Sequence, residues 1–391
     1  MSQQTDPAVV ADQAAVVAAA WSPPHAPPTW ALTAAQFATL RDDHELLAIA
    51  ATIPPDRLPP LLFSAAATFL VRADEPEPLR GWFPRLGEPQ PPLGPRFAAQ
   101  YRSFCLENRE RLLQLCARHR YQMNEVGRCA HLLPALTAAI ASGRALALID
   151  IGTGAGLALY LDRYRYRFRS PGGATTALGD PGSAVEIATD VGGTAQLRLP
   201  RALPPLAERI GIDIEPLQVA DYRVREWLTA CLPQEIGAIT RFHHAAELAA
   251  AGSGRLLRGD ACDTLAEAVS SIDADRLICI VDSYVHVFFA DEQLRRFRRY
   301  VDRLGAERDL DWISLDPLIP MGRDATTTVI GAEPPPSLLR RNRTAGAVFG
   351  VLARVGWRHG SRTSELLALG HPGAAWIEPI PEASPVGPAA A

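Results

Sequence analysis

The chain contains no lysine, since all 39 of its basic residues are arginine. A lysine amine forms the Schiff base of pyridoxal phosphate enzymes, and a Walker A loop needs Gly-Lys followed by Ser or Thr. Both classes of protein are therefore excluded. Cysteine is sparse as well, with six residues scattered along 391 and no Cys-x-x-Cys pair. This pattern predicts reduced thiols and argues against a zinc site.

Long apolar runs and clusters of positive charge are also missing. No run approaches the ~20 residues of a membrane span, and the net charge is −4. No basic block favours a nucleic-acid partner. Residues 1–20 carry two aspartates and no positive charge, so we expect no secretory signal. We therefore expect a cytoplasmic monomer or homodimer that takes a small-molecule substrate and binds neither membrane nor nucleic acid.

The patterning divides the chain into two parts. Residues 1–143 are rich in alanine and proline and show helical spacing, which predicts a helical domain that covers the active site. Residues 144–391 alternate strands and helices, which is typical of an α/β fold with a mostly parallel sheet. The expected helices include 97–116, 126–141 and 291–304. The expected strands are 145–150, 209–213, 255–260, 275–282 and 310–316, followed by an antiparallel hairpin of 364–369 and 374–380.

Residues 168–207 interrupt this alternation. They contain two glycine pairs and two strand-like pieces, at 185–188 and 195–199. We interpret the segment as an inserted β-hairpin or lid.

The stretch Leu-Ile-Asp-Ile-Gly-Thr-Gly-Ala-Gly at 148–156 is the most informative motif. An apolar run ends at Asp150, Gly152, Gly154 and Gly156 then alternate, and a helical pattern follows. Glycine suits a turn with positive φ or close approach to a ligand, and the N–H groups of such a turn favour an electron-rich partner. The dinucleotide fingerprint is G-x-G-x-x-G/A, whereas its last position here is Leu157, which disfavours a nicotinamide oxidoreductase.

The order acid-x-G-x-G-x-G resembles the first motif of class I S-adenosylmethionine-dependent methyltransferases. That resemblance implies a Rossmann-like core with S-adenosyl-L-methionine as cofactor, held by the three glycines together with Asp150 and Thr153.

Further acids follow the strands that would neighbour this turn. Asp213, Asp260 and Asp282 each end an expected strand, and ligands of open parallel sheets bind at the carboxyl ends of strands. Asp213 can accept hydrogen bonds from ribose hydroxyls, and Asp260 would lie near an adenine ring. The structural alternative for each aspartate is a role in a helix cap or a turn. Asp213 lies about 60 residues beyond the turn instead of the usual ~20, and removing 168–207 restores the usual spacing.

Several side chains are candidates for contact with the methyl acceptor. Tyr284 and His286 follow the strand that ends at Asp282 and could orient the acceptor or remove its proton, and Glu125 is a further candidate base. Asn124 and Arg128 precede the sheet, where Arg128 could hold a carboxylate as a fork. The structural alternatives are packing, capping and a salt bridge.

Tyr164 and Tyr166 could form a wall of the acceptor pocket or simply pack inward. His243, His244 and His371 have no carboxylate or cysteine at ligand spacing beside them, so we expect no metal site.

Four segments together resemble the bacterial domain-of-unknown-function 2332 family: 123–130, the glycine turn through 166, 209–216 and 259–261. The resemblance covers about 40–380 and implies a methyltransferase-like Rossmann core with an added N-terminal helical region and no general assigned reaction. The chain departs from that family at Met123, where a small polar residue is expected, and in the ending from His371 to Trp376. We expect both departures to border the substrate pocket.

Methyl transfer to a small molecule, with a carboxylate-bearing metabolite as one option, is the function that these patterns favour. Two alternatives remain open: the same fold with other chemistry, and a noncatalytic ligand-binding module. The last alternative predicts that Tyr284, His286, Glu125 and Arg128 point into packed structure.

Overall fold

Five of the apolar runs become neighbouring parallel strands in the computed structural model, which describes residues 5–22, 28–76, 78–85, 88, 90–318, 334–344 and 349–381. Their order across the sheet is β6-β5-β1-β7-β8, the order 3-2-1-4-5 that doubly wound sheets adopt. All five strands were predicted. Their bounds are β1 Leu146–Ile151, β5 Leu206–Asp213, β6 Arg255–Arg258, β7 Leu277–Ser283 and β8 Leu310–Pro317.

The described part of the sheet has eleven strands, and the C-terminal strands continue it beyond β8. β9 (Gly350–Arg358) runs antiparallel to β8, and β10 (Ser361–Gly370) antiparallel to β9. β10 and β11 (Trp376–Pro379) form the predicted antiparallel hairpin. The fold is therefore α/β with a large, mostly parallel mixed sheet.

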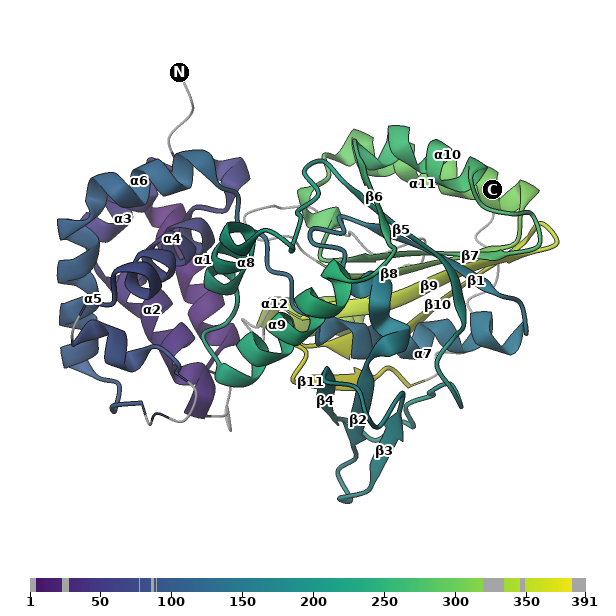
Figure 1. Cartoon of the computed structure of the whole chain (residues 1–391), viewed down its shortest axis with the longest axis horizontal. Coiled ribbons are helices and arrows are strands. Elements are labelled where there is room, and N and C mark those ends of the chain that lie inside the picture. Colours follow the sequence, from purple (N-terminus) through teal and green to yellow (C-terminus); the bar gives the residue numbers. More distant parts are fainter. Residues whose placement is uncertain are drawn as a thin grey trace.

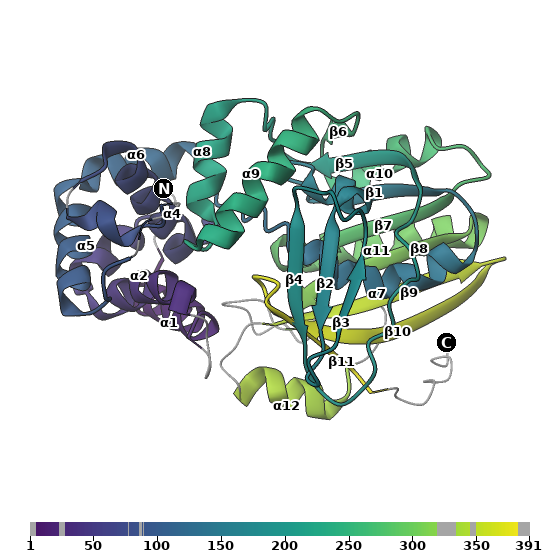
Figure 2. The ribbon, with the colours of Figure 1, turned by 60° about the horizontal axis from the view of Figure 1, so that its bottom comes forward.

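The inserted segment extends the sheet. β2 (Arg165–Arg169) pairs antiparallel with β3 (Thr175–Leu178) and parallel with β4 (Glu186–Val191), which joins β11. The piece at 195–199 forms no strand. Figure 2 shows these three strands side by side. Of the two predicted alternatives, a β-hairpin or a lid, the structure therefore favours the hairpin, in which β2 and β3 pair and every second side chain of β2 and β4 is buried.

The helix expected after the glycine turn is replaced by a short 3-10 segment, η4 (Leu157–Arg163), which bends at Tyr160. Side chains take the carbonyls that an α-helix would use internally. Tyr164 and Tyr166 donate their hydroxyls to the carbonyls of Leu157 and Leu161, both at 2.6 Å. Arg209 donates to Leu159 O and forms a bidentate pair with Asp162.

Helices cover both faces of the sheet and form a separate group at its side (Figure 1). α10 and α11 pack on one face, and α7 packs against β7, β8, β9 and β10 on the other. α7 therefore lies against the sheet although its residues precede position 143. The side group contains α1 to α6, with short 3-10 segments at Pro28–Trp30, Pro55–Arg57 and Leu79–Trp82, and α8 packs against its α4.

The helix bounds are as follows: α1 Pro7–Ala20, α2 Ala31–Asp42, α3 His44–Ala50, α4 Pro59–Asp74, α5 Pro95–Glu107, α6 Arg109–Arg118, α7 Arg128–Ala141, α8 Tyr222–Cys231, α9 Ile236–Ala250, α10 Ala261–Ser270, α11 Asp291–Glu307 and α12 Pro336–Thr344. The predicted helix at 97–116 is divided into α5 and α6 at Asn108. Within the described residues, no helix combines the length and the apolar character that crossing a membrane requires.

Leu136→Ala tests whether α7 is part of the core of the sheet. Leu136 is fully buried, so its truncation should lower the free energy of unfolding by about 2–5 kcal/mol. The control is Ile140→Ala in the same helix, whose side chain is half-buried and should cost less. Urea denaturation measures both variants, and equal losses would contradict the placement of α7.

Candidate functional site

The three glycines of the turn after β1 all adopt left-handed backbone conformations. Their φ angles are 65° at Gly152, 55° at Gly154 and 73° at Gly156. Neighbouring side chains approach so closely that a Cβ would lie 2.5 Å from Val285 at the first glycine and 2.6 Å from Asn124 at the second. The turn therefore needs glycine for its backbone and also for the packing around it.

Every N–H group of residues 152–156 already has an acceptor within the protein. Gly152 and Thr153 donate to Ile212 O at 2.8 and 3.2 Å, and Gly156 donates to Thr153 O. The two central amides are bound by side chains. Gly154 N donates to Asp213 Oδ2 and Ala155 N to Asn124 Oδ1, both at 2.9 Å. A ligand can use these two amides only by displacing a side chain.

Among the predicted acids, Asp213 keeps the most capacity to accept further hydrogen bonds. It is half-buried at the end of β5, and its Oδ1 accepts from Glu215 N at 2.8 Å. Each carboxylate oxygen keeps a second lone pair. The next residue, Ile214, leaves 71% of its surface exposed, so an apolar side chain and an acceptor stand together at this edge.

The other predicted cofactor residues have local partners. Asp150 is buried and accepts from Thr153 Oγ1 at 2.7 Å. Burial, aided by the nearby Asp282 and Asp213 and opposed by the hydrogen bond from Thr153, raises its pKa to about 7. Asp260 accepts from Cys262 N at 2.8 Å and from Gln293. Asp260 is therefore the N-cap of α10, which is the structural alternative to cofactor binding.

The segment before α7 contacts the turn and α9. Asn124 holds the turn, as described above. Glu125 is buried and pairs with Arg241 of α9 at 2.9 Å, while it also accepts from Gly127 N at 2.8 Å. This ion pair occupies the Glu125 carboxylate, so the structure favours the salt-bridge interpretation over a free base.

Arg128 and Tyr284 do meet, as the predicted acceptor site requires. The Arg128 guanidinium lies 4.2 Å above the Tyr284 ring, and its Nε donates to Pro372 O at 2.9 Å. Tyr284 has a φ of 59°, an unusual backbone for a non-glycine residue that directs it toward Arg128. Burial raises the pKa of its hydroxyl.

Tyr164 and Tyr166 are fully buried, and the hydroxyl bonds given above fix η4. The structure thus selects the inward-packing interpretation for both, and neither lines an open pocket.

His286 is also fully buried, on the opposite face of the sheet from α7. Its ring lies among Phe289, Phe297 and Trp312 under α11. Its two nitrogens approach Asp282 Oδ2 at 3.4 Å and Asp316 Oδ2 at 3.8 Å. The structure therefore separates His286 and Asp282 from Tyr284 and Arg128.

Sequence reasoning missed Asp316. The available signal was an aspartate at the end of one strand, beside the i, i+4 pair Asp282 and His286 at the end of its neighbour.

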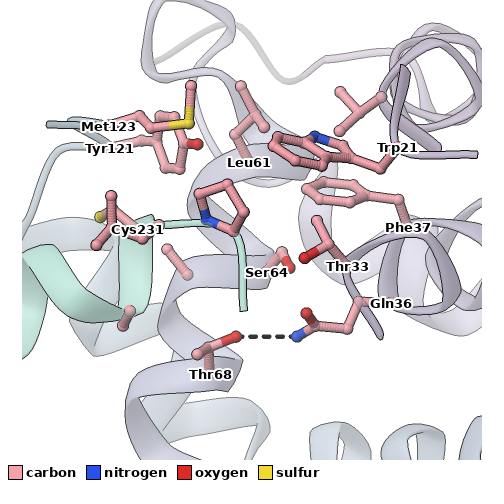
Figure 3. A pocket seen from close by; sticks show the side chains of 15 residues that line it. Trp21, Thr33, Gln36, Phe37, Leu61, Ser64, Thr68, Tyr121, Met123 and Cys231 are labelled. Atoms are coloured by element: carbon pink, nitrogen blue, oxygen red, sulfur yellow. Dashed lines mark hydrogen bonds between the residues drawn. The ribbon is translucent and has the colours of Figure 1, made fainter. Parts of the chain in front are cut away.

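A small cavity lies between α1, α2, α4 and the end of α8 (Figure 3). Trp21 and Phe37 lie on one side of it and Met123 on the opposite side, and Gln36 donates to Thr68 Oγ1 at 2.9 Å at the lower end of the view. No charged residue is among the described residues that line it.

One of the two segments in which the chain is expected to depart from the family lines this cavity, and the other contacts a lining residue from outside it. Met123 lines it directly and precedes Asn124. Trp21, another lining residue, packs edge-on against His371 with ring centroids 5.1 Å apart.

Comparison with known proteins assigns a family and no activity. Residues 11–378 match a family of uncharacterized proteins conserved in bacteria (DUF2332). The match spans most of the chain, so the chain belongs to this family. No curated protein matches the sequence.

Asp150→Asn should change the pH dependence of stability. The unfolded carboxyl loses its proton near pH 4, whereas the folded one keeps it until about pH 7, so the wild type loses stability as pH rises between these values. The variant lacks this loss. Its free energy of unfolding relative to that of the wild type should therefore be higher at pH 7.5 than at pH 4.5, by on the order of 1–3 kcal/mol. Urea denaturation at both pH values measures it, with exposed Asp273→Asn as control. A difference between variant and wild type that is independent of pH would refute the assignment.

Gly154→Ala and Asn124→Ala should be energetically coupled. Alanine at 154 is strained by its positive φ and meets Asn124 Oδ1, so it should cost about 1–3 kcal/mol. Removing the Asn124 amide relieves the contact, so the double variant should lose less than the sum of the single losses by about 0.5–1 kcal/mol. A double-mutant cycle by urea denaturation measures this coupling, and strict additivity would show that the two groups do not touch.

Proposed function

We propose that this member of the DUF2332 family binds S-adenosylmethionine at the carboxyl edge of β1 and β5 and transfers its methyl group to a small-molecule acceptor. One observation carries the proposal. A three-glycine turn in left-handed conformation, a half-buried carboxylate at Asp213 and the exposed Ile214 lie together beside the strand where the order of the sheet reverses. In open α/β sheets, that position is where ligands bind.

Each of these groups suits a part of the cofactor. The free lone pairs of Asp213 would accept from the ribose hydroxyls, and Ile214 would cover one face of the adenine ring. The Ala155 amide would donate to the carboxylate of the amino-acid part. Asn124 Oδ1 now takes that amide's hydrogen bond, so it stands where the ligand carboxylate would be. Rotation of one side chain would vacate the position.

The residues around the site also restrict the acceptor. The bound cofactor supplies the electrophilic methyl group, and the protein aligns the acceptor and excludes water. Glu125 is held by Arg241, His286 is fully buried, and the pKa of Tyr284 is raised. These groups are poorly suited to remove a proton from an alcohol or amine at neutral pH. A carboxylate acceptor needs no base, and Arg128 beside Tyr284 would hold it.

The internal pairing of the turn supports a second candidate. All five amides of 152–156 have acceptors within the protein, and Glu125 and His286 point into packed structure, as a noncatalytic module predicts. In that case the fold keeps a methyltransferase-like edge without methyl transfer. A labelled methyl group from S-adenosylmethionine that appears in a small-molecule product would exclude this candidate.

Asp213→Asn should weaken binding of S-adenosylhomocysteine about 10- to 100-fold, because hydrogen bonds to a charged acceptor contribute about 1.5–3 kcal/mol. Isothermal titration calorimetry measures the affinity. The control is Glu215→Gln, an exposed carboxylate two residues away, which should bind as the wild type does. Absence of binding by folded wild-type protein, or equal affinity of Asp213→Asn, would sink the proposal.

A further inference from the structure

Asp282, His286 and Asp316 form a buried cluster that methyl transfer does not use. Asp282 lies in β7, His286 begins the short segment η5 (His286–Phe288), and Asp316 lies in β8. Their side chains are 0%, 0% and 1% exposed. One potential ligand atom from each lies within 4.8 Å of the others. Two carboxylates in such a dry place need a compensating positive charge.

The distances from the His286 imidazole to the two carboxylates exceed those of short, charge-assisted hydrogen bonds. His286 Nε2 lies 3.4 Å from Asp282 Oδ2, whereas a charge-assisted N–H···O bond is usually about 2.7–2.9 Å long. Two ligands of a tetrahedral zinc ion, each about 2.0–2.2 Å from the metal, lie about 3.4 Å apart. The separation of His286 Nε2 and Asp282 Oδ2 therefore fits two ligands of a shared cation, with Nε2 as the nitrogen that binds it.

A carboxylate oxygen in the cluster lacks a partner. Asp282 Oδ1 is fully buried and makes no hydrogen bond to any described residue. A buried carboxylate oxygen without a donor is costly and calls for a ligand. Metal coordination would satisfy it and would supply a further oxygen donor beside the imidazole.

Outer hydrogen bonds hold the carboxylates in orientation, as in protein metal sites. Trp312 Nε1 donates to Asp282 Oδ2 at 2.6 Å. Asp316 accepts from the backbone N–H groups of Val285, His286 and Val287 at 3.3, 3.2 and 3.3 Å. The turn after β7 is thereby fastened to the end of β8.

We propose that Asp282, His286 and Asp316 bind one divalent transition-metal ion. One imidazole and two carboxylates suit zinc, manganese or ferrous iron, and the burial of all three points to a structural ion that fastens β7 and β8 together. The site lies on the α11 face and does not rest on the proposed methyl transfer.

The metal content of tag-free protein from zinc-supplemented cultures tests this directly by inductively coupled plasma mass spectrometry. The wild type should carry about one equivalent of a divalent transition metal per chain, and His286→Gln and Asp282→Asn less than about one tenth. His131→Gln replaces another fully buried histidine and should keep the metal. Trp312→Phe should weaken the affinity about 10- to 100-fold.

Wild-type protein refolded with and without Co²⁺ gives a readout that does not depend on how the variants fold. Refolding with Co²⁺ should produce visible d–d absorption and a higher Tm than refolding with a chelator. If the purified wild type contains no metal and its Tm is the same after refolding with Co²⁺ as with a chelator, the proposed metal site is wrong. The three residues are then an Asp-His-Asp ion triad. Equal metal content in wild type and His286→Gln would place the ion elsewhere and overturn it as well.

Discussion

The glycine turn at the end of β1 is the constraint on which the rest of the site depends. Its three left-handed glycines allow Val285 and Asn124 to approach the backbone, and they direct the central amides toward Asp213 and Asn124. The turn thereby joins β1, β5, the exit of β7 and the segment before α7. The same pairing explains why the turn is closed here. A ligand must compete with side chains that already satisfy the backbone.

The two faces of the sheet separate the polar groups into two sites. On the α7 side, Arg128 and Tyr284 are partly accessible and contact each other. On the α11 side, Asp282, His286 and Asp316 are sealed among aromatic rings. Residues 282–286 link the two clusters, and Tyr284, with a φ of 59°, departs from the extended backbone that would place its side chain on the same face as that of Asp282. A metal on one face would therefore stabilise the turn that presents Tyr284 on the other.

The sequence predicted the strands well because apolar runs bounded by turn residues report burial directly. The five parallel strands and the C-terminal hairpin were predicted, whereas β2, β3 and β9 were not. The prediction from sequence was wrong after the glycine turn, where the spacing of Leu157, Leu159 and Tyr164 predicts a helix. The hydroxyls of Tyr164 and Tyr166, together with Arg209 from β5, take the carbonyls of that segment, and no local pattern reveals such long-range bonds. The predictions of site residues that depend on three-dimensional neighbours were the weakest. Glu125 and Asp260 look free in the sequence, and their partners Arg241 and Gln293 are distant along the chain.

Hydrogen exchange measured by mass spectrometry, with and without S-adenosylhomocysteine, tests the central claim most directly. If the cofactor replaces Asn124 at the glycine turn, peptides covering 119–127 and 148–161 should change their exchange together and saturably, while peptides of α5 and α6 should not. Unchanged exchange in both site peptides at saturating ligand would contradict the account.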